Sequence, residues 1–576
     1  MTVIFAILIP FLFSAILFAC GSKFRFARHA AVAAAAASLI LSAAAAYMQP
    51  RIIFPWLGGV FDFILNADSF SSLMAVLASA LSLLSAFYAF YSNKPAAHFQ
   101  IMLFAQASAI GALYADSLAA MAFFTGMLPL SVFFAHSEKA QKNSNDPGIF
   151  SLTAGISAFL LLVAGISIIG YISGTMNISE IASSKITLNY GWSASAFVLA
   201  AIASFYFMGI FPFSVFREKE ISGLPFHLRI FYLLIYFIAG TNILIRFIAE
   251  ISVPGSTARL IVFGIGIIAA LIASIISFSD GSENKFPLKI MAAQAGIAVC
   301  AAAFAQTQGA ALMLAMMAVP AVFGFAVAAE DLRSIPAGRA ILLAYIAALA
   351  SLPPFGDALR QEMSGLIGSH SFMFLLICLA QAIFVAALAK FFFSLQKEGN
   401  GTDNVLPSNA VIAFLPLLFL LLCGFGGKMA EHIFVLPSIE SLGLDISLLP
   451  RGTANVYMSL LLTILFSLLI CQAAEAYSAE EENGGGENSV LMKAVKFLRN
   501  EKEDEGAKAK RNNPSVQQGN RKSLLKMIFW DWPYNIFDKM TELVSPAAEC
   551  SLNVSMAAAA VLAAAGIILA AMGLFN

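Results

Sequence analysis

The residues best suited to catalysis or metal binding are few and lie far apart along the chain. The six cysteines and six histidines form no Cys-x-x-Cys pair and no close cluster of the kind that binds a metal. The sequence also contains no nucleotide-binding loop and no catalytic-triad motif. We therefore expect no metal, no cofactor and no enzyme activity in the isolated chain.

A second set of residues consists of neutral polar side chains inside long apolar runs. Charged side chains inside a membrane usually mark an ion path, whereas single amides and hydroxyls more often join helices. The centres of the apolar runs contain no acidic or basic residue, and Arg246 and Lys390 lie toward run ends, where long side chains reach the interface. We interpret the neutral set mainly as helix contacts: Gln106, Thr125, Ser204, Tyr206, Tyr232, Tyr236, Asn242, Gln294, Tyr345 and Gln381.

The elements that position these residues are membrane-spanning helices. Of the 576 residues, 60% are hydrophobic and 11% charged, and the mean hydropathy is +0.85, whereas soluble domains are about 25% charged. Apolar runs lie near 2–20, 29–48, 69–91, 99–115, 117–135, 149–173, 193–215, 228–248, 257–278, 288–306, 308–329, 336–354, 371–395, 408–424, 455–477 and 552–574. Since about 20 apolar residues cross a bilayer, the sequence predicts an all-α polytopic membrane protein with about 14 to 16 transmembrane helices.

The loops between these runs indicate an orientation. With the N-terminus outside, most of the 33 Lys and Arg residues fall on the cytoplasmic side. Because the first run lacks a basic segment before it, we expect a retained span rather than a cleaved signal peptide. The balance of 33 basic and 33 acidic residues argues against nucleic acid as a partner. The lipid bilayer, and specifically the cell inner (cytoplasmic) membrane, is the expected location.

Several motifs appear in the order and spacing of one protein family. They are Asn66-Ala67-Asp68-Ser69-Phe70-Ser71, Ala115-Asp116-Ser117-Leu118, Phe211-Pro212-Phe213, Pro287-Leu288-Lys289 and Ser351-Leu352-Pro353-Pro354-Phe355-Gly356 with Glu362 beyond. Over about residues 65–395, with a weaker echo toward the C-terminus, the chain resembles the antiporter-like membrane subunits of respiratory complex I. Membrane-bound hydrogenases and multisubunit cation/proton antiporters share this family.

The resemblance implies two inverted five-helix repeats, each with a helix broken at mid-membrane, and Pro212 and Pro353-Pro354 fit those two breaks. Broken helices are tolerated in a membrane only where protein or a water-lined cavity faces the freed backbone. The expected organisation is N-terminal helices over 1–115, a first repeat over 116–248, a second repeat over 249–395, further helices over 396–477, a cytoplasmic linker and interfacial segment over 478–551, and a last helix within 552–576.

The departures from the family pattern concern its buried charges. Where the resemblance implies a glutamate in the fifth helix stands Gly126, and where it implies a lysine before the helix-seven proline stands Phe207. The helix-eight position is Tyr232, a helix-twelve lysine position reads Gln361, and helix eleven has no ionisable residue between Gln306 and Glu330. A proton relay needs groups that exchange protons at a reachable pH; glycine, phenylalanine and glutamine do not, and unperturbed tyrosine titrates at about pH 10.

The sequence leaves three functional hypotheses open. The first is a diverged subunit of a complex I-like or membrane hydrogenase-like ion-translocating complex, with a degraded proton relay, a structural or coupling role and other membrane subunits as partners. The second is a stand-alone transporter of a neutral or lipidic substrate, and the third is an assembly protein. Candidates for a residual transport path are Asp116, Tyr206, Tyr232, Arg246, Lys289, Asp357, Arg360, Gln361, Glu362 and Lys390.

The first hypothesis makes a direct prediction. Replacing Tyr232 or Arg360 with an apolar residue should leave ion transport by the assembled complex nearly unchanged, because neither side chain would relay protons. Transport measured in reconstituted vesicles checks this, and a large loss in either variant would contradict a degraded relay.

Overall fold

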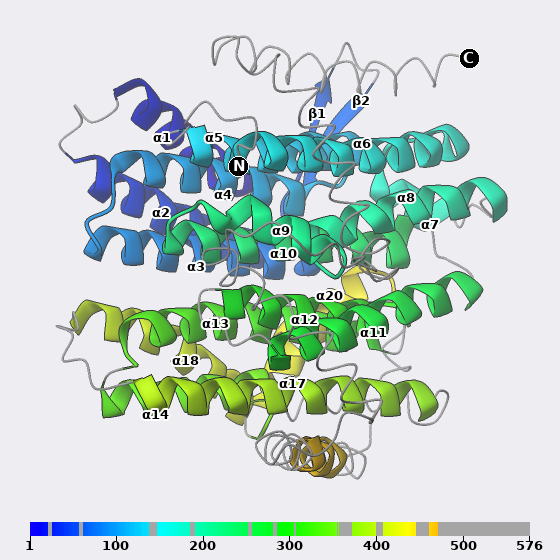
Figure 1. Cartoon of the computed structure of the whole chain (residues 1–576). Coiled ribbons are helices and arrows are strands. Elements are labelled where there is room, and N and C mark those ends of the chain that lie inside the picture. Colours follow the sequence, from blue (N-terminus) through cyan, green and yellow to red (C-terminus); the bar gives the residue numbers. More distant parts are fainter. Residues whose placement is uncertain are drawn as a thin grey trace, which may run out of the picture.

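The computed structural model consists almost entirely of long helices that run side by side (Figure 1). It describes residues 1–20, 26–56, 61–137, 147–184, 190–251, 256–279, 285–304, 307–333, 335–353, 355, 371–398, 407–444 and 460–470. Within these residues, ten helices are long and apolar enough to cross a membrane, or up to 12 spans if each of two bent helix pairs counts as one. The shorter apolar helices are Phe286–Ala302, Ala337–Leu349 and Leu460–Ile470.

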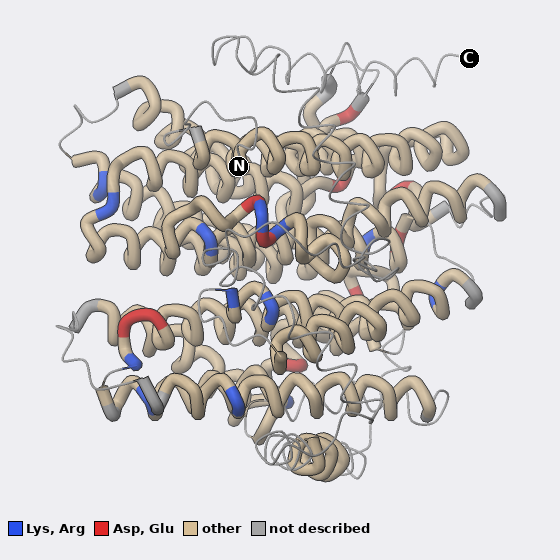
Figure 2. The backbone as a smooth tube through the Cα atoms, in the orientation of Figure 1, with Lys and Arg blue, Asp and Glu red and all other residues tan. Residues whose placement is uncertain are grey.

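Every predicted span up to residue 477 overlaps one of these helices, and the all-α polytopic fold is thereby confirmed. The predicted segment 478–551 and the last predicted span lie outside the described residues. Large apolar side chains such as Phe11, Ile268 and Leu418 are exposed on the helix surfaces. Charged residues, in contrast, are sparse along the helices (Figure 2). An apolar exterior of this kind is matched to lipid rather than to water.

The first group of helices extends from the N-terminus to the middle of the chain and occupies the upper part of Figure 1. Its elements are α1 (Thr2–Cys20), α2 (Ala27–Met48), α3 (Ser69–Tyr91), α4 (Ala96–Tyr114), α5 (Leu118–Ser137), α6 (Pro147–Ser173), α7 (Ile178–Ser184), α8 (Tyr190–Met208), α9 (Phe213–Ser222) and α10 (Phe226–Arg246), with a π-helical turn at Phe247–Ile251.

The second group occupies the lower part of Figure 1 and packs on the first through α10, which contacts α12 and α13. It comprises α11 (Ser256–Ser279), α12 (Phe286–Ala302), α13 (Gln308–Asp331), α14 (Pro336–Leu349), α17 (Ser371–Glu398), α18 (Pro407–Phe425), α19 (Gly427–Ala430), a π-helical turn at Glu431–Val435 and α20 (Leu436–Ser441). The predicted boundary between repeats, 248/249, falls inside the π-helical turn after α10. The inverted symmetry of the repeats stays a prediction.

A β-hairpin between α2 and α3 was not predicted from the sequence. Strands β1 (Arg51–Trp56) and β2 (Phe61–Asn66) pair antiparallel, with Arg51 opposite Asn66. The hairpin is tied to the bundle because the amide of Asp116 donates to the carbonyl of Ile64 at 2.9 Å. It therefore fixes the segment between α4 and α5.

Of the two predicted helix breaks, the first is confirmed at Pro212, where α8 and α9 meet at an angle of 41°. At the second, α14 ends at Leu349, and residues 356–370 lie outside the described part. A further bend of 96°, not predicted, separates α18 from the helical segment Gly427–Ser441.

Helices α11 and α12 approach closely through small residues. A Cβ added at Gly296 would lie 2.6 Å from the backbone nitrogen of Ala270, and one added at Gly266 would lie 2.9 Å from the backbone nitrogen of Cys300. In lipid, the hydrophobic effect does not drive helices together, because the lipid tails are as apolar as the helix surfaces. Close van der Waals packing of this kind therefore drives helix association.

This contact predicts unequal effects at two glycines of the same helix. Gly266→Val should destabilise the protein by about 1–3 kcal/mol, because the added carbons overpack the α11–α12 contact. Gly264→Val is the matched control, since no heavy atom lies within 4 Å of a Cβ added there. Thermal unfolding in mild detergent measures both, and similar losses in the two variants would contradict the packing argument.

Candidate functional site

The interruption between α8 and α9 exposes backbone groups inside the bundle. Gly209, directly after α8, has a φ of +68°, a conformation that side-chain-bearing residues rarely adopt. Pro212 has no amide hydrogen to continue the helix. One backbone acceptor at the break, the carbonyl of Tyr206, receives a hydrogen bond from Nη2 of Arg217 at 3.1 Å. A side chain of α9 thus compensates for the interruption at the end of α8.

Arg217 belongs to a buried ion pair on α9. Its Nη1 lies 2.6 Å from Oε2 of Glu220, and the two side chains are 1% and 0% exposed. Three residues apart on a helix, they share one face. Because removing two charges from water costs several kcal/mol each, such a pair persists only when further hydrogen bonds complete both groups.

Two tyrosines from neighbouring helices complete the pair. The hydroxyl of Tyr206, on α8, donates to Oε1 of Glu220. The guanidinium of Arg217 lies 3.9 Å from the ring centroid of Tyr236, on α10, and 5.0 Å from that of Tyr206. Cation–π contacts of this kind gain strength when water is excluded. We call these four residues the Arg217 cluster.

The helix carrying this cluster is also fixed at its far end. Nε2 of His136, in the last turn of α5, lies 2.6 Å from the backbone carbonyl of Glu220. Both residues are buried. The position of α9 is therefore set by contacts to α5, α8 and α10 together.

The sequence pattern does not predict this cluster. Arg217 lies in the predicted loop after the apolar run 193–215, and that loop assignment is wrong, because α9 continues to Ser222 and buries Arg217 and Glu220. The Arg–Glu spacing of three residues before Gly223 was the available signal, because it fits one helix face.

A second charged network surrounds Arg246 at the opposite end of α10. Its Nη2 lies 3.0 Å from Oδ2 of Asp68 and 2.5 Å from the hydroxyl of Ser71, and its Nη1 lies 2.8 Å from Oε2 of Glu250. Asp68 also caps α3 by accepting from the Ser71 amide at 2.6 Å. Arg246 is 1% exposed, so the expectation that it reaches the interface is wrong.

Asp116 lies close to this network, in the segment between α4 and α5. One of its oxygens is 3.2 Å from Nη2 of Arg51, and the hydroxyl of Ser179 donates to it at 2.7 Å. Burial raises the pKa of the Asp116 carboxyl, while the Ser179 hydrogen bond and the charges of Arg246 and Arg51 oppose that rise. The residue thereby joins the β-hairpin, α5 and α7.

The other path candidates that the structure describes lie on separate helices. Tyr232 is buried one turn before Tyr236, with ring centroids 6.2 Å apart. Lys289 is buried on α12, and the ammonium of Lys390, on α17, donates to the carbonyl of Phe278 at 2.9 Å. The remaining candidates, Asp357, Arg360, Gln361 and Glu362, lie outside the described residues.

The positions at which the family resemblance implies a charge in helices five and seven are packed with carbon. A Cβ added at Gly126 would lie 2.8 Å from the ring of Phe159. Phe207 is fully buried, and its ring centroid lies 5.5 Å from that of Tyr236. At both positions, apolar side chains therefore fill the space that a charged side chain would need.

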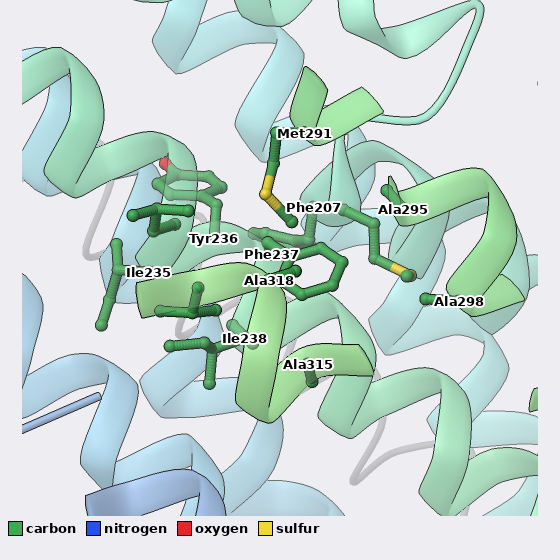
Figure 3. Close-up of a cluster of buried hydrophobic side chains, with 14 of the residues drawn as sticks. Phe207, Ile235, Tyr236, Phe237, Ile238, Met291, Ala295, Ala298, Ala315 and Ala318 are labelled. Atoms are coloured by element: carbon green, nitrogen blue, oxygen red, sulfur yellow. The ribbon is translucent and has the colours of Figure 1, made fainter. Parts of the chain in front are cut away.

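The same apolar packing continues between the two helix groups. Figure 3 shows Phe207 and Phe237 of the first group beside Met291, Ala295 and Ala318 of the second. All of these residues are buried. We call this contact of α8, α10, α12 and α13 the apolar seam. Among the labelled residues of Figure 3, Tyr236 belongs to the Arg217 cluster, and the others carry apolar side chains.

No family model and no curated protein matches the sequence. Solved structures, however, are similar. The Mrp complex from Dietzia sp. DQ12-45-1b contains a chain that matches with a TM-score of 0.72 and 16% identity, covering 95% of this chain and 62% of that one. The present chain thus spans less than two thirds of that relative's length.

Two further structures match over nearly their whole matched chains. Respiratory complex I from Thermus thermophilus with bound NADH gives a TM-score of 0.67 at 17% identity, covering 77% of this chain and 99% of that one. The membrane-bound sulfane sulfur reductase, an archaeal respiratory membrane complex, gives 0.67 at 13% identity, covering 79% and 99%. The chain therefore has the antiporter-like membrane subunit fold.

Proposed function

We propose that the chain is an integral membrane subunit of an ion-translocating redox or antiporter complex, with a structural or coupling role and without the usual proton relay. The similar structures are membrane chains of an Mrp complex, complex I and a respiratory reductase, which supports membership in such an assembly. The observation that carries the second part is the packing of Phe207 and Phe159 into the positions where the relay would need charges.

The Arg217 cluster is consistent with this role. Each charged group already has a protein partner: Glu220 accepts from Arg217 and Tyr206, and Arg217 also binds the backbone at the helix break. A relay group must exchange its proton with a neighbour, and arginine is effectively always protonated. The cluster is thus better suited to holding α9 than to transferring protons.

Co-purification tests membership in a complex. The tagged chain should be extracted from its native membrane in mild detergent and its partners identified by mass spectrometry. We expect further antiporter-like membrane subunits, with redox proteins if the complex is respiratory. A chain that is recovered alone and stable would contradict the subunit role and favour a stand-alone transporter. A soluble-tag control excludes proteins that bind the tag.

Paired substitutions separate a structural role of the Arg217 cluster from an ion-conducting one. Arg217→Met alone should destabilise the protein by about 3–5 kcal/mol, because it leaves the Glu220 charge buried and unpaired. Arg217→Met combined with Glu220→Leu should recover most of that loss, since apolar residues of similar volume often replace a buried pair. Unfolding in detergent and co-purification of partners measure both variants.

The same double variant also reports on transport. In the proposed role, a complex that assembles with R217M/E220L should transport ions at nearly the wild-type rate. Normal assembly combined with lost transport would show that the pair lies on the ion path and would overturn the proposal. The conservative Arg217→Lys variant tests geometry, since lysine retains the charge without the planar guanidinium.

A further inference from the structure

An open cleft lies between the two helix groups, and Ile221, which follows Glu220 on α9, is one of its lining residues. Its lining comes from α9, α10, α12, α13 and α17. The lining includes Arg229, Leu233, Phe325, Ala329, Glu330 and Phe391.

The inner part of the cleft is lined by apolar side chains. Leu233 and Phe325 are buried, and the ring of Phe391 stacks on that of Phe286 with centroids 3.8 Å apart. An occupant of this part must itself be apolar, because the lining there offers no polar side chain to replace water.

The mouth of the cleft, in contrast, carries two opposite charges. Arg229 stands in the first turn of α10 and Glu330 in the last turn of α13. The Nε atom of Arg229 is buried and has no hydrogen-bond partner among the described residues. A buried donor left without a partner costs about 1–3 kcal/mol. Rotation of the half-buried Arg229 side chain toward an acceptor bound at the mouth would offset that cost.

The order of these groups along the helices indicates the class of ligand. Leu233 lies one helical turn inward from Arg229, and Phe325 lies more than one turn inward from Glu330. Charges thus mark the helix ends, at the membrane interface, and apolar side chains mark the membrane interior. A phospholipid has the same order, with its headgroup at the interface and its acyl chains inward.

We propose that this cleft binds a zwitterionic phospholipid with a primary ammonium group, such as phosphatidylethanolamine. The phosphate lies against Arg229, the ammonium lies against Glu330, and one acyl chain occupies the apolar cleft beside Phe325 and Phe391. The lipid joins the two helix groups where their contact is open. The proposal does not depend on whether the chain conducts ions.

Native mass spectrometry of the full-length protein in mild detergent tests the site, with phosphatidylethanolamine or phosphatidylglycerol added at equal concentrations. The wild type should retain phosphatidylethanolamine in preference to phosphatidylglycerol. Ala329→Phe, which fills the cleft, should abolish retention. Its matched control is Ala33→Phe, an exposed alanine of α2.

The charge variants keep the test independent of packing changes in α13. Arg229→Gln should lower retention of both lipids by about two- to fivefold, the size expected for one partly exposed ion pair. Glu330→Gln should weaken only phosphatidylethanolamine and reduce the preference over phosphatidylglycerol. Arg28→Gln removes an arginine bonded to Asn93 away from the cleft and should change nothing.

The proposal is overturned if the wild type retains no phospholipid, if it binds both lipids equally, or if the control variants lose as much lipid as the cleft variants. Retention that survives in Ala329→Phe would likewise place the lipid elsewhere on the surface.

Discussion

Every polar group buried in a membrane bundle must find its partner within the protein, because lipid offers none. The break at Gly209 and Pro212 is where this constraint acts most strongly. The carbonyl of Tyr206 at the break accepts a hydrogen bond from Arg217. The charge of Arg217 is paired with Glu220, and Glu220 accepts a hydrogen bond from the Tyr206 hydroxyl. The interruption of the helix thus accounts for Arg217 and Glu220 in α9, the helix that follows it.

Helix α10 lies at the centre of these dependencies. Buried over nearly its whole length, it supplies Tyr236 to the Arg217 cluster at one level and Arg246 to the second network at its end. Between them, Gly240 allows α8 to approach, since a Cβ there would lie 2.7 Å from the backbone of Met208. Contacts to charged groups and a close glycine contact therefore alternate along α10. These contacts leave α10 little freedom to move separately from α8 and α3.

Most of the fold follows from hydropathy, because a bilayer imposes one length on every span. The break at Pro212 was predicted from the family resemblance and not from proline alone, since Pro129 and Pro320 lie inside continuous helices. The hairpin was missed although its signal is present: Ile52-Ile53-Phe54 and Phe61-Asp62-Phe63 flank Gly58-Gly59, a pattern typical of paired strands.

The candidate site was harder to predict than the fold. Hydropathy ends a span at its last apolar run, so Arg217 and Glu220 looked like loop charges. Their pairing depends on where α9 turns, and the burial of Arg246 depends on Asp68, which lies far away in sequence. Tyr206, identified as one of the neutral polar residues and as one of the path candidates, became informative once its partner was known. Tertiary contacts of this kind leave no periodic trace in a single sequence.

The two charged clusters and the apolar seam together bear on how such a subunit could couple its neighbours. In the proposed role, a chain without the family's proton relay transmits displacement instead, and displacement requires rigid contacts. The ion pairs at two levels of α10 and the close glycine contacts of α8 and α11 supply that rigidity within each helix group. Between the groups, Phe207, Phe237 and Met291 are buried beside one another, so movement of one group would be passed on by packing. In the proposed role, an apolar side chain at Phe207 thus takes the place of a proton-exchanging group and packs the contact between the groups at the same time.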